Sequence, residues 1–317
     1  MTSKPYVVTL GETMALMASD TPGPLAHAST LSLGIGGSES NVAIGLQRLG
    51  VQAVWCGRIG ADALGRLVER EIRGEGVDVR ATVDDGAPTG LMIKERRTPT
   101  AQNVAYYRSG SAGSRIAPDD VDEQLIAGAA LLHVSGITPA LSPQAAATIR
   151  YAVAAAKAAG VPVSFDLNYR SKLWNAETAA AVYREIIPQV DIVFAGLEEA
   201  RLADGAVEEA EEAARRIASM GPGQVVIKLG ADGAMAFVDG QVFRQDALPI
   251  DALDTVGAGD AFVAGYLAEF VEGLGPGERL RTAVSTGAFV CLVPGDWEGL
   301  PRRDELDILR NQEPVSR

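Results

Sequence analysis

Short apolar runs rich in β-branched residues alternate with longer stretches of helical periodicity along most of the chain. Such short runs predict buried strands, and apolar residues at helical spacing predict amphipathic helices. The runs lie at Tyr6–Leu10, Val51–Cys56, Leu131–Val134, Val161–Leu167, Asp191–Phe194 and Gln224–Lys228. Helices are predicted over Ser142–Gly160, Glu177–Ile187 and Val207–Met220. Because strand and helix alternate from residue 131 onward, we expect an α/β fold with a mostly parallel sheet, right-handed crossovers and helices on both faces.

Two segments break this alternation. Residues 13–36 are rich in Thr, Pro, Gly and Ser and have no helical face, while residues 88–112 hold two strand-like pieces around a polar turn. Neither segment suits a crossover helix, so we expect both to form a small antiparallel sheet, a lid on a single domain spanning residues 1–317. A separate hairpin is predicted over Ala234–Asp246, because Asp239-Gly240 suits the tight type I′ turn.

Composition narrows the class of protein. Of the 317 residues 47% are hydrophobic, so the chain can bury a large core, and its net charge is −13. This acidity argues against nucleic acid as a partner, because a phosphate backbone needs clustered cations. No segment has the pattern of a signal peptide or a membrane span, so we expect a cytoplasmic protein that does not contact membranes.

Several common site types are absent from the sequence. Cys56 and Cys291 lack metal-ligand spacing and are expected to be buried thiols. His133 lies inside an apolar strand and is expected to be a hydrogen-bonded core residue. The segment Gly34–Glu39 lacks the last glycine of a dinucleotide-binding loop, and no P-loop sequence occurs.

The strongest candidate for chemistry is the sequence DTVGAGD at residues 254–260, followed by an apolar helix. Small residues leave backbone amides open to an anion, and the helix dipole adds positive charge at the same place. Asp260 would then lie where a carboxylate can accept a proton from a hydroxyl that attacks a phosphoryl group. A glycine-rich turn with Asp in the first helical turn explains the same sequence without any chemistry, so the motif alone leaves both interpretations open.

The sequence DTVGAGDAFVAGYL at residues 254–267 closely resembles the C-terminal signature of the ribokinase-like (PfkB) family of sugar kinases. The sequence GGSESNVA at residues 36–43 resembles the N-terminal signature of the same family, with Ser38 where another small residue is commoner. Two signatures in the family's order are far more specific than one. The resemblance covers essentially residues 5–310 and implies a ribokinase-like fold.

Within this family, four stretches resemble the 2-keto-3-deoxygluconate kinases. They are YYRSGSA at 106–112, HVSGITPAL at 133–141, FDLNYRSKLW at 165–174 and GDWEG at 295–299. The resemblance implies substrate contacts from Gly37, Ser38, Asn41, Tyr106, Arg108, Arg170 and Asp296. It implies ATP contacts from Asn168, Arg170, Lys228, Gly230, Gly233 and the turn at 257–260, with Gly257, Ala258 and Gly259 as an anion hole and Asp260 as the base.

The activity implied is ATP-dependent phosphorylation of 2-keto-3-deoxygluconate to its 6-phospho form, with Mg²⁺ as a further cofactor. A sugar acid carries a carboxylate, which the planar fork of Arg108 or Arg170 can bind through both oxygens. Many family members carry N-x-x-E near the phosphates, but here Gly196 replaces the Asn. Glu199 therefore remains as the metal-side residue, acting through water. Exposed lid strands also favour a homo-oligomer.

Two other functions remain open at this point. A fructokinase or another neutral-sugar kinase would share both signatures, and it would differ in whether the arginines face the sugar. A non-catalytic sugar or nucleotide sensor on the same fold would bind ligand without producing ADP. The gluconate and galactonate epimers fit the sequence equally well.

Overall fold

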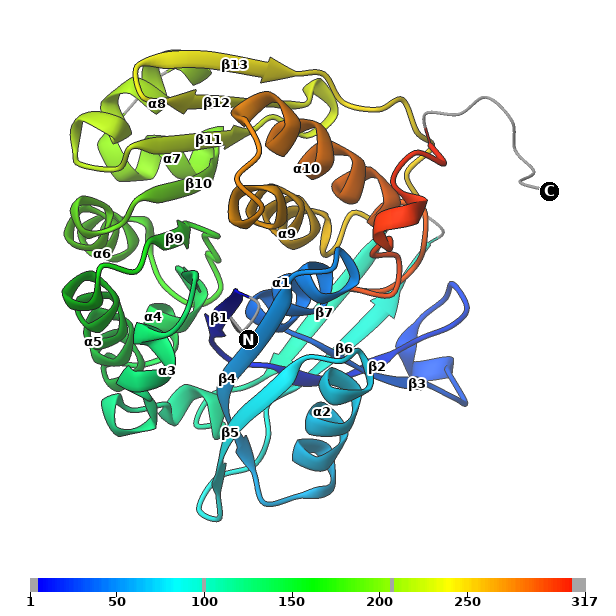
Figure 1. Ribbon diagram of the computed structural model, residues 1–317. Coiled ribbons are helices and arrows are strands. Elements are labelled where there is room, and N and C mark those ends of the chain that lie inside the picture. Colours follow the sequence, from blue (N-terminus) through cyan, green and yellow to red (C-terminus); the bar gives the residue numbers. More distant parts are fainter. Residues whose placement is uncertain (1–4, 99–100, 206–207, 310–317) are drawn as a thin grey trace.

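A nine-stranded sheet forms the centre of the protein. The structure is a computed structural model, which describes residues 5–98, 101–205 and 208–309. The strand order is β13-β12-β11-β10-β9-β8-β1-β4-β5 (Figure 1). The strands are β1 (Tyr6–Leu10), β4 (Gln52–Gly60), β5 (Asp78–Asp84), β8 (Leu131–Ser135), β9 (Val163–Asp166), β10 (Ile192–Gly196), β11 (Gln224–Lys228), β12 (Ala234–Val238) and β13 (Gln241–Gln245).

The sheet is parallel from β11 to β5, as the alternating pattern predicts, and each predicted apolar run forms one of its strands. The hairpin is also confirmed, since β12 and β13 pair antiparallel at one edge. Asp239 and Gly240 at its tip both have positive φ, 49° and 84°, as a type I′ turn requires.

Helices cover both faces of the sheet (Figure 1). On one face α1 and α9 pack around Trp55 and Tyr266, and on the other α5 and α6 pack around Phe165 and Tyr183. The helices are α1 (Ser38–Arg48), α2 (Ala63–Gly74), α3 (Glu123–Ala127), α4 (Ile137–Leu141), α5 (Pro143–Ala159), α6 (Ala176–Ile186), α7 (Leu197–Asp204), α8 (Ala210–Ser219), α9 (Ala258–Val271) and α10 (Pro276–Val290). The predicted start of α8 at Val207 lies outside the described residues.

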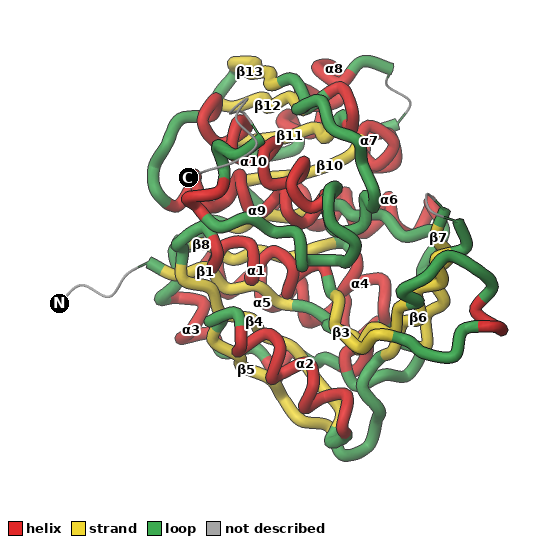
Figure 2. The backbone as a smooth tube through the Cα atoms, turned by 90° about the vertical axis from the view of Figure 1, so that its right-hand side faces the viewer, coloured by secondary structure: helices red, strands yellow, loops and turns green. Residues whose placement is uncertain are grey.

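The two irregular segments form a second sheet of four strands, which we call the lid sheet (Figure 2). Its order is β3-β2-β6-β7, with β2 at Met14–Ala18, β3 at Ser32–Gly36, β6 at Leu91–Arg96 and β7 at Gln102–Tyr107. The expectation of a purely antiparallel sheet is wrong, because β2 pairs parallel with β6. The reason lies in the topology: β2 follows β1 and β6 follows β5, and both enter from the same edge of the parallel sheet.

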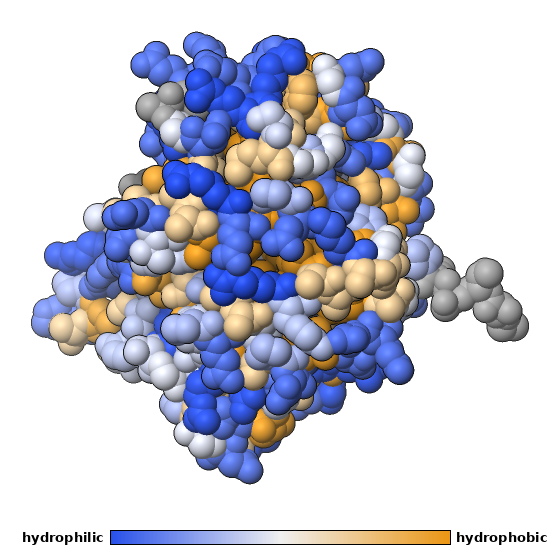
Figure 3. All heavy atoms as spheres, turned by 90° about the vertical axis from the view of Figure 1, so that its left-hand side faces the viewer, coloured by the Kyte–Doolittle hydropathy of each residue, from blue (hydrophilic) through white to orange (hydrophobic). Residues whose placement is uncertain are grey.

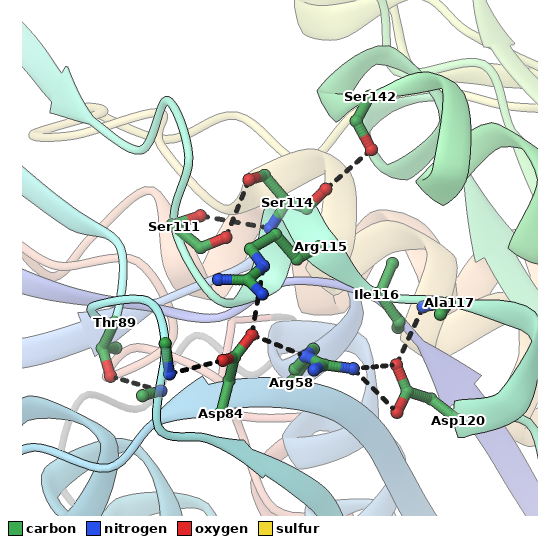
Figure 4. Close-up of polar contacts among 12 residues, drawn as sticks. Arg58, Asp84, Thr89, Ser111, Ser114, Arg115, Ile116, Ala117, Asp120 and Ser142 are labelled. Carbon is green, nitrogen blue, oxygen red and sulfur yellow. Dashed lines mark hydrogen bonds and ion pairs between the residues drawn. The ribbon is translucent and has the colours of Figure 1, made fainter.

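A network of ion pairs anchors the chain where it returns from the lid sheet to the main domain (Figure 4). Arg58 on β4 donates to Asp84 at the end of β5 (3.0 Å) and to Asp120 on the returning segment (3.0 Å). Arg115 pairs with Asp84 from the other side at 3.3 Å. The base of the lid sheet is therefore fixed at one side by charge as well as by backbone pairing.

The surface over the α5–α6 side is mainly hydrophilic, with apolar atoms in small separate patches (Figure 3). Among the described residues, no helix combines the length and apolarity needed to span a membrane. Cys56, Cys291 and His133 are buried, as predicted, and His133 Nδ1 lies 2.9 Å from the Ser164 hydroxyl. Burial lowers the pKa of His133 to about 3, so this residue is neutral.

The order of the strands places a binding site. The chain builds outward from β1 through β4 and β5, and then from β8 through β11 in the other direction. Ligands of open parallel sheets bind outside the carboxyl ends of the strands near such a switch point. The loops after β1, β8, β9, β10 and β11 all open at this edge, facing the lid sheet.

Candidate active site

A cavity of about 1490 Å³ lies between the carboxyl edge of the main sheet and the lid sheet. Asp166, Gly196 and Lys228 reach it from the ends of β9, β10 and β11. The lid sheet contributes Met92 and Tyr106. The cavity thus has one wall on the rigid sheet and one on the lid, and its volume suits a nucleotide together with a small second substrate.

Asp260 lies in the first turn of α9 and faces this cavity, although the residue is only 8% exposed. Its Oδ1 accepts a hydrogen bond from the Ser38 hydroxyl (2.7 Å), and its Oδ2 accepts one from the Asn41 amide (2.8 Å). Asn168 in turn donates to the Ser38 hydroxyl at 2.9 Å. The two signature segments therefore meet at one carboxylate, and the N-terminus of α1 fixes its orientation.

The surroundings of Asp260 shift the pKa of its carboxyl in opposite directions. Burial raises the pKa of its carboxyl, while the hydrogen bonds from Ser38 and Asn41 and the charges of Arg170 and Lys228 oppose that rise. The net result is a carboxylate that binds a proton more readily than an ordinary aspartate. Such a group is suited to general-base chemistry.

The turn before α9 has the geometry of an anion site. Gly257 is the N-cap residue with a φ of 79°, a conformation that favours glycine. Because the first amides of a helix have no carbonyl partner within it, they can donate to an anion. Gly259 is the next glycine in this turn, and a Cβ placed on it would lie 3.9 Å from Lys228 Nζ, so an ammonium lies beside the turn.

Lys228 pairs with Asp166, whose carboxylate oxygens lie 2.7 and 2.9 Å from the ammonium. Burial raises the pKa of Asp166 to about 6, although Lys228 opposes this rise. Burial opposes the charge of Lys228 too, but Asp166 and Glu199 raise its pKa overall, so the ammonium stays charged. A cation is thereby held next to the anion turn.

The two arginines proposed for the sugar carboxylate differ in their environment. Arg108 is buried and already paired, since its Nε donates to Glu12 Oε2 at 2.8 Å. Arg170 is exposed at the cavity mouth and forms no ion pair within the described part of the chain. Glu12 therefore balances the charge of Arg108 whether or not a sugar carboxylate is bound.

Tyr106 and Tyr107 lie on opposite faces of β7, as alternation along a strand predicts. Tyr106 faces the cavity, with the Lys172 ammonium 5.7 Å from its ring centre. Tyr107 lies on the other face and is 61% exposed.

The structure brings most of the predicted site residues to this one cavity. Those that line it are Gly37, Ser38, Asn41, Tyr106, Arg108, Asn168, Arg170, Glu199, Lys228, Gly257, Gly259, Asp260 and Asp296. Ala258, Gly230 and Gly233 are not among the lining residues. The amide of Ala258 donates to the Thr255 carbonyl (3.3 Å), and a Cβ on Gly233 would collide with the Gln245 carbonyl at 2.1 Å. Close packing against Gln245 therefore explains the glycine at position 233 without any contact with ATP.

The carboxylates near Lys228 do not fit a metal site built by the protein. Glu199 accepts backbone hydrogen bonds at both oxygens, from Tyr169 (2.8 Å) and Gly196 (2.6 Å). Within residues 5–98, 101–205 and 208–309, no group of three His, Cys, Asp or Glu side chains is arranged to hold a metal ion. A role for Glu199 through water stays a prediction.

Four charged residues in or beside the cavity are not among those predicted from the sequence: Glu12, Lys94, Asp166 and Asp254. Glu12 and Asp166 could have been found, because both lie at the carboxyl end of a buried strand, where ligands gather. Asp254 is part of the DTVGAGD motif. Nothing in the sequence indicated Lys94, which reaches the site only because the lid sheet folds over the cavity.

Comparison with known proteins decides the family. The model of the pfkB family of carbohydrate kinases matches residues 4–303. The chain belongs to this family. This pfkB kinase is 37% identical to a 2-dehydro-3-deoxygluconokinase of Thermoproteus tenax, an alignment covering 96% of this chain and 93% of the relative. It is 36% identical to a 2-dehydro-3-deoxygalactonokinase of Haloferax volcanii, covering 89% and 88%.

A solved structure agrees with these relatives. The 2-dehydro-3-deoxygluconokinase of Thermotoga maritima superimposes with a TM-score of 0.88 at 28% identity, covering 96% of this kinase and 98% of that chain. The ribokinase-like fold predicted from the two signatures is therefore confirmed for this pfkB kinase.

Proposed function

We propose that this pfkB kinase transfers the γ-phosphate of ATP to the primary hydroxyl of 2-keto-3-deoxygluconate (2-dehydro-3-deoxygluconate), giving the 6-phospho sugar acid. The observation that carries the proposal is the position of Asp260, a buried carboxylate that faces the cavity at the N-terminus of α9, next to the anion turn and Lys228. A proton acceptor beside an anion cradle is the combination that phosphoryl transfer needs.

Asp260 accepts the proton of the attacking hydroxyl. Ser38 and Asn41 hold its two oxygens, so that the carboxylate is oriented before substrate arrives. The substrate hydroxyl replaces or joins the Ser38 contact at Oδ1. As the hydroxyl oxygen forms its bond to the γ-phosphorus, its proton passes to Asp260 and the bond from the γ-phosphorus to the ADP oxygen breaks.

The anion turn and Lys228 stabilise the transferring group. Backbone amides at Gly257, Gly259 and Asp260 donate to phosphate oxygens, and the ammonium of Lys228 adds positive charge on the sheet side. Mg²⁺ carried by the ATP phosphates would neutralise further charge there. Closure of the lid sheet over the cavity excludes water, which would otherwise accept the phosphate.

Arg170 recognises the carboxylate of the sugar acid. It is the exposed arginine at the cavity mouth, whereas Arg108 is engaged by Glu12 and supports the wall behind it. The relatives named as 2-dehydro-3-deoxygluconokinases in two other organisms support a sugar acid over a neutral sugar. A cytoplasmic location, where ATP is available, agrees with this activity.

The prediction of a homo-oligomer is supported by large apolar side chains exposed on the lid sheet, namely Leu33 and Tyr107. Light scattering coupled to size exclusion gives the mass in solution. A particle of 33.1 kDa, the mass of one chain, would contradict the prediction.

The proposed activity is tested by measuring ADP release over a panel of acceptors. The panel contains 2-keto-3-deoxygluconate, its galactonate epimer, fructose and ribose, and phosphorus NMR locates the new phosphate. We expect the sugar acid to give the fastest ADP release, with one phosphate on the primary hydroxyl for each ADP. Release without a phosphorylated sugar, or ligand binding without release, would favour the sensor.

A further inference from the structure

A buried lysine connects the lid sheet to both ends of the reaction site. Lys94 lies on β6, and its side chain is 7% exposed at the boundary of the cavity. Its Nζ lies 2.8 Å from Asp254 Oδ2 and 3.2 Å from Asp296 Oδ1. Both carboxylates belong to the main domain, so one ammonium joins the lid to two separate loops.

Asp254 lies three residues before the anion turn at 257–260. Its Oδ1 accepts the backbone N–H of Val256 at 3.0 Å, which fixes the chain just before Gly257. Its other oxygen faces Lys94. The position of the ammonium therefore bears directly on the residue that shapes the phosphate-binding turn.

Asp296 lines the cavity, and its backbone packs against Gly257 of the turn. A Cβ placed on Gly36 of β3 would lie 2.4 Å from Asp296 Oδ2, so this carboxylate packs against the lid sheet a second time. Burial raises the pKa of Asp296 to about 6, whereas Lys94 opposes this rise and favours the ionised form. Without the lysine, two buried carboxylates would face each other with no ammonium between them.

We infer that Lys94 is a positioning residue for phosphoryl transfer, which holds the anion turn and Asp296 in register with the lid sheet. The ammonium touches neither the phosphates nor the reacting hydroxyl in this account. Its two ion pairs form only when β6 lies over the cavity, so the turn acquires its binding geometry together with lid closure. This role of Lys94 rests on the proposed function for the identity of the sugar acid. The expected effect of Lys94 on the affinity for ATP does not depend on which sugar is the acceptor.

The test compares Lys94→Met, Lys94→Arg and the control Lys157→Met, which removes an exposed lysine on α5. Calorimetry measures the affinity for a non-hydrolysable ATP analogue without sugar, and kinetics then give kcat and KM for 2-keto-3-deoxygluconate. We expect Lys94→Met to weaken analogue binding about tenfold, a typical coupling between two sites. We also expect a lower kcat, partial recovery with arginine, and no change in Lys157→Met.

A second variant separates positioning from charge balance. Lys94→Met/Asp254→Asn removes one of the two carboxylates and keeps a side-chain oxygen for the Val256 amide. We expect this variant to regain thermal stability while its analogue affinity stays weak. Wild-type analogue affinity in either folded variant would overturn the inference. Analogue binding needs no sugar acid. A wild-type enzyme that is inactive on 2-keto-3-deoxygluconate would therefore refute the proposed substrate, while the analogue affinities of the variants would still test the role of Lys94.

Discussion

Gly257 lies directly against the backbone of Asp296, and a Cβ placed on Gly257 would come within 1.8 Å of the Asp296 carbonyl oxygen. Gly257 also has a φ of 79°, which an alanine rarely adopts. The phosphate turn and the loop that bears Asp296 are therefore packed together without room for a single methyl group.

This contact predicts the effect of Gly257→Ala. The sequence alone suggests that a larger residue here would block ATP and leave sugar binding intact. The packing against Asp296 predicts instead that the variant loses affinity for both ligands, because the added methyl group displaces the loop on the sugar side. Calorimetry with an ATP analogue and with the sugar acid checks this, and Gly277→Ala on α10, where nothing lies within 4 Å, is the control. Unchanged sugar-acid affinity would contradict the prediction.

Asp260→Asn tests the base. The amide keeps the size of the carboxylate and can still accept the Ser38 hydrogen bond, but it cannot take up the substrate proton. General bases contribute about 10²–10⁴-fold, so kcat should fall by that factor while ATP analogue binding is retained. The exposed Asp304→Asn serves as control. Turnover near the wild-type rate in a folded Asp260→Asn protein would remove Asp260 from this role.

The pH dependence of kcat/KM follows from buried carboxylates. Burial raises the pKa of Asp260, and it raises the pKa of Asp166 and of Asp296 to about 6. Protonation of Asp166 and Asp296 weakens the ion pairs that hold Lys228 and Lys94, so activity should be lost as the pH falls through about 6. Because Asp260 acts as a base only when deprotonated, its raised pKa adds to the loss on the acid side. A rate profile from pH 4.5 to 8 measures this, and a flat profile down to pH 5 would exclude it.

Asp166 and Asp296 also make the free energy of unfolding depend on pH, and in the opposite direction to the activity. Because the folded state binds protons at Asp166 and Asp296 more tightly than the unfolded chain, their contribution to the free energy of unfolding declines as the pH rises from about 3.8 to about 6. The protein should thus be least active where these two carboxyls contribute most to its stability. Denaturant unfolding of the wild type beside Asp296→Asn isolates this contribution: the variant should gain relative stability as the pH rises through this interval.

Arg108 and Arg170 should respond differently to replacement by alanine. Arg108→Ala leaves the fully buried carboxylate of Glu12 without its guanidinium partner. Breaking a buried ion pair in this way typically lowers the free energy of unfolding by about 3–5 kcal/mol. Arg170→Ala should leave stability unchanged and reduce the preference for the sugar acid. Thermal unfolding and kinetics on both variants decide between the roles. A stable Arg108→Ala variant that loses more preference than Arg170→Ala would reverse the assignment.

The main sheet could be predicted from the sequence because its signals are local. Apolar runs such as Val163–Asp166 and a turn pair such as Asp239-Gly240 determine their own conformation within a few residues. The pairing of β2 with β6 could not be predicted in the same way. Its direction depends on where β1 and β5 end in the main sheet, which is a property of the assembled fold.

The site residues likewise fall into those that local sequence motifs predict and those that depend on distant partners. Asp260, Asn41 and the 257–260 turn belong to two signatures, so the sequence indicates them as a group. Glu12 and Lys94 act through partners far away in the chain, Arg108 and Asp296, and no periodicity or spacing links these positions. Ion pairs between distant segments become visible only when the lid sheet is placed over the cavity.

The ratio of kcat/KM for 2-keto-3-deoxygluconate to that for fructose shows whether this kinase prefers a sugar acid. A site that places Arg170 against a carboxylate loses a charged partner when the sugar is neutral, which commonly costs a few kcal/mol, and each ~1.4 kcal/mol is tenfold. We expect a ratio of at least about a hundred. A ratio of one or less, with fructose phosphorylated as well as the acid, would contradict it.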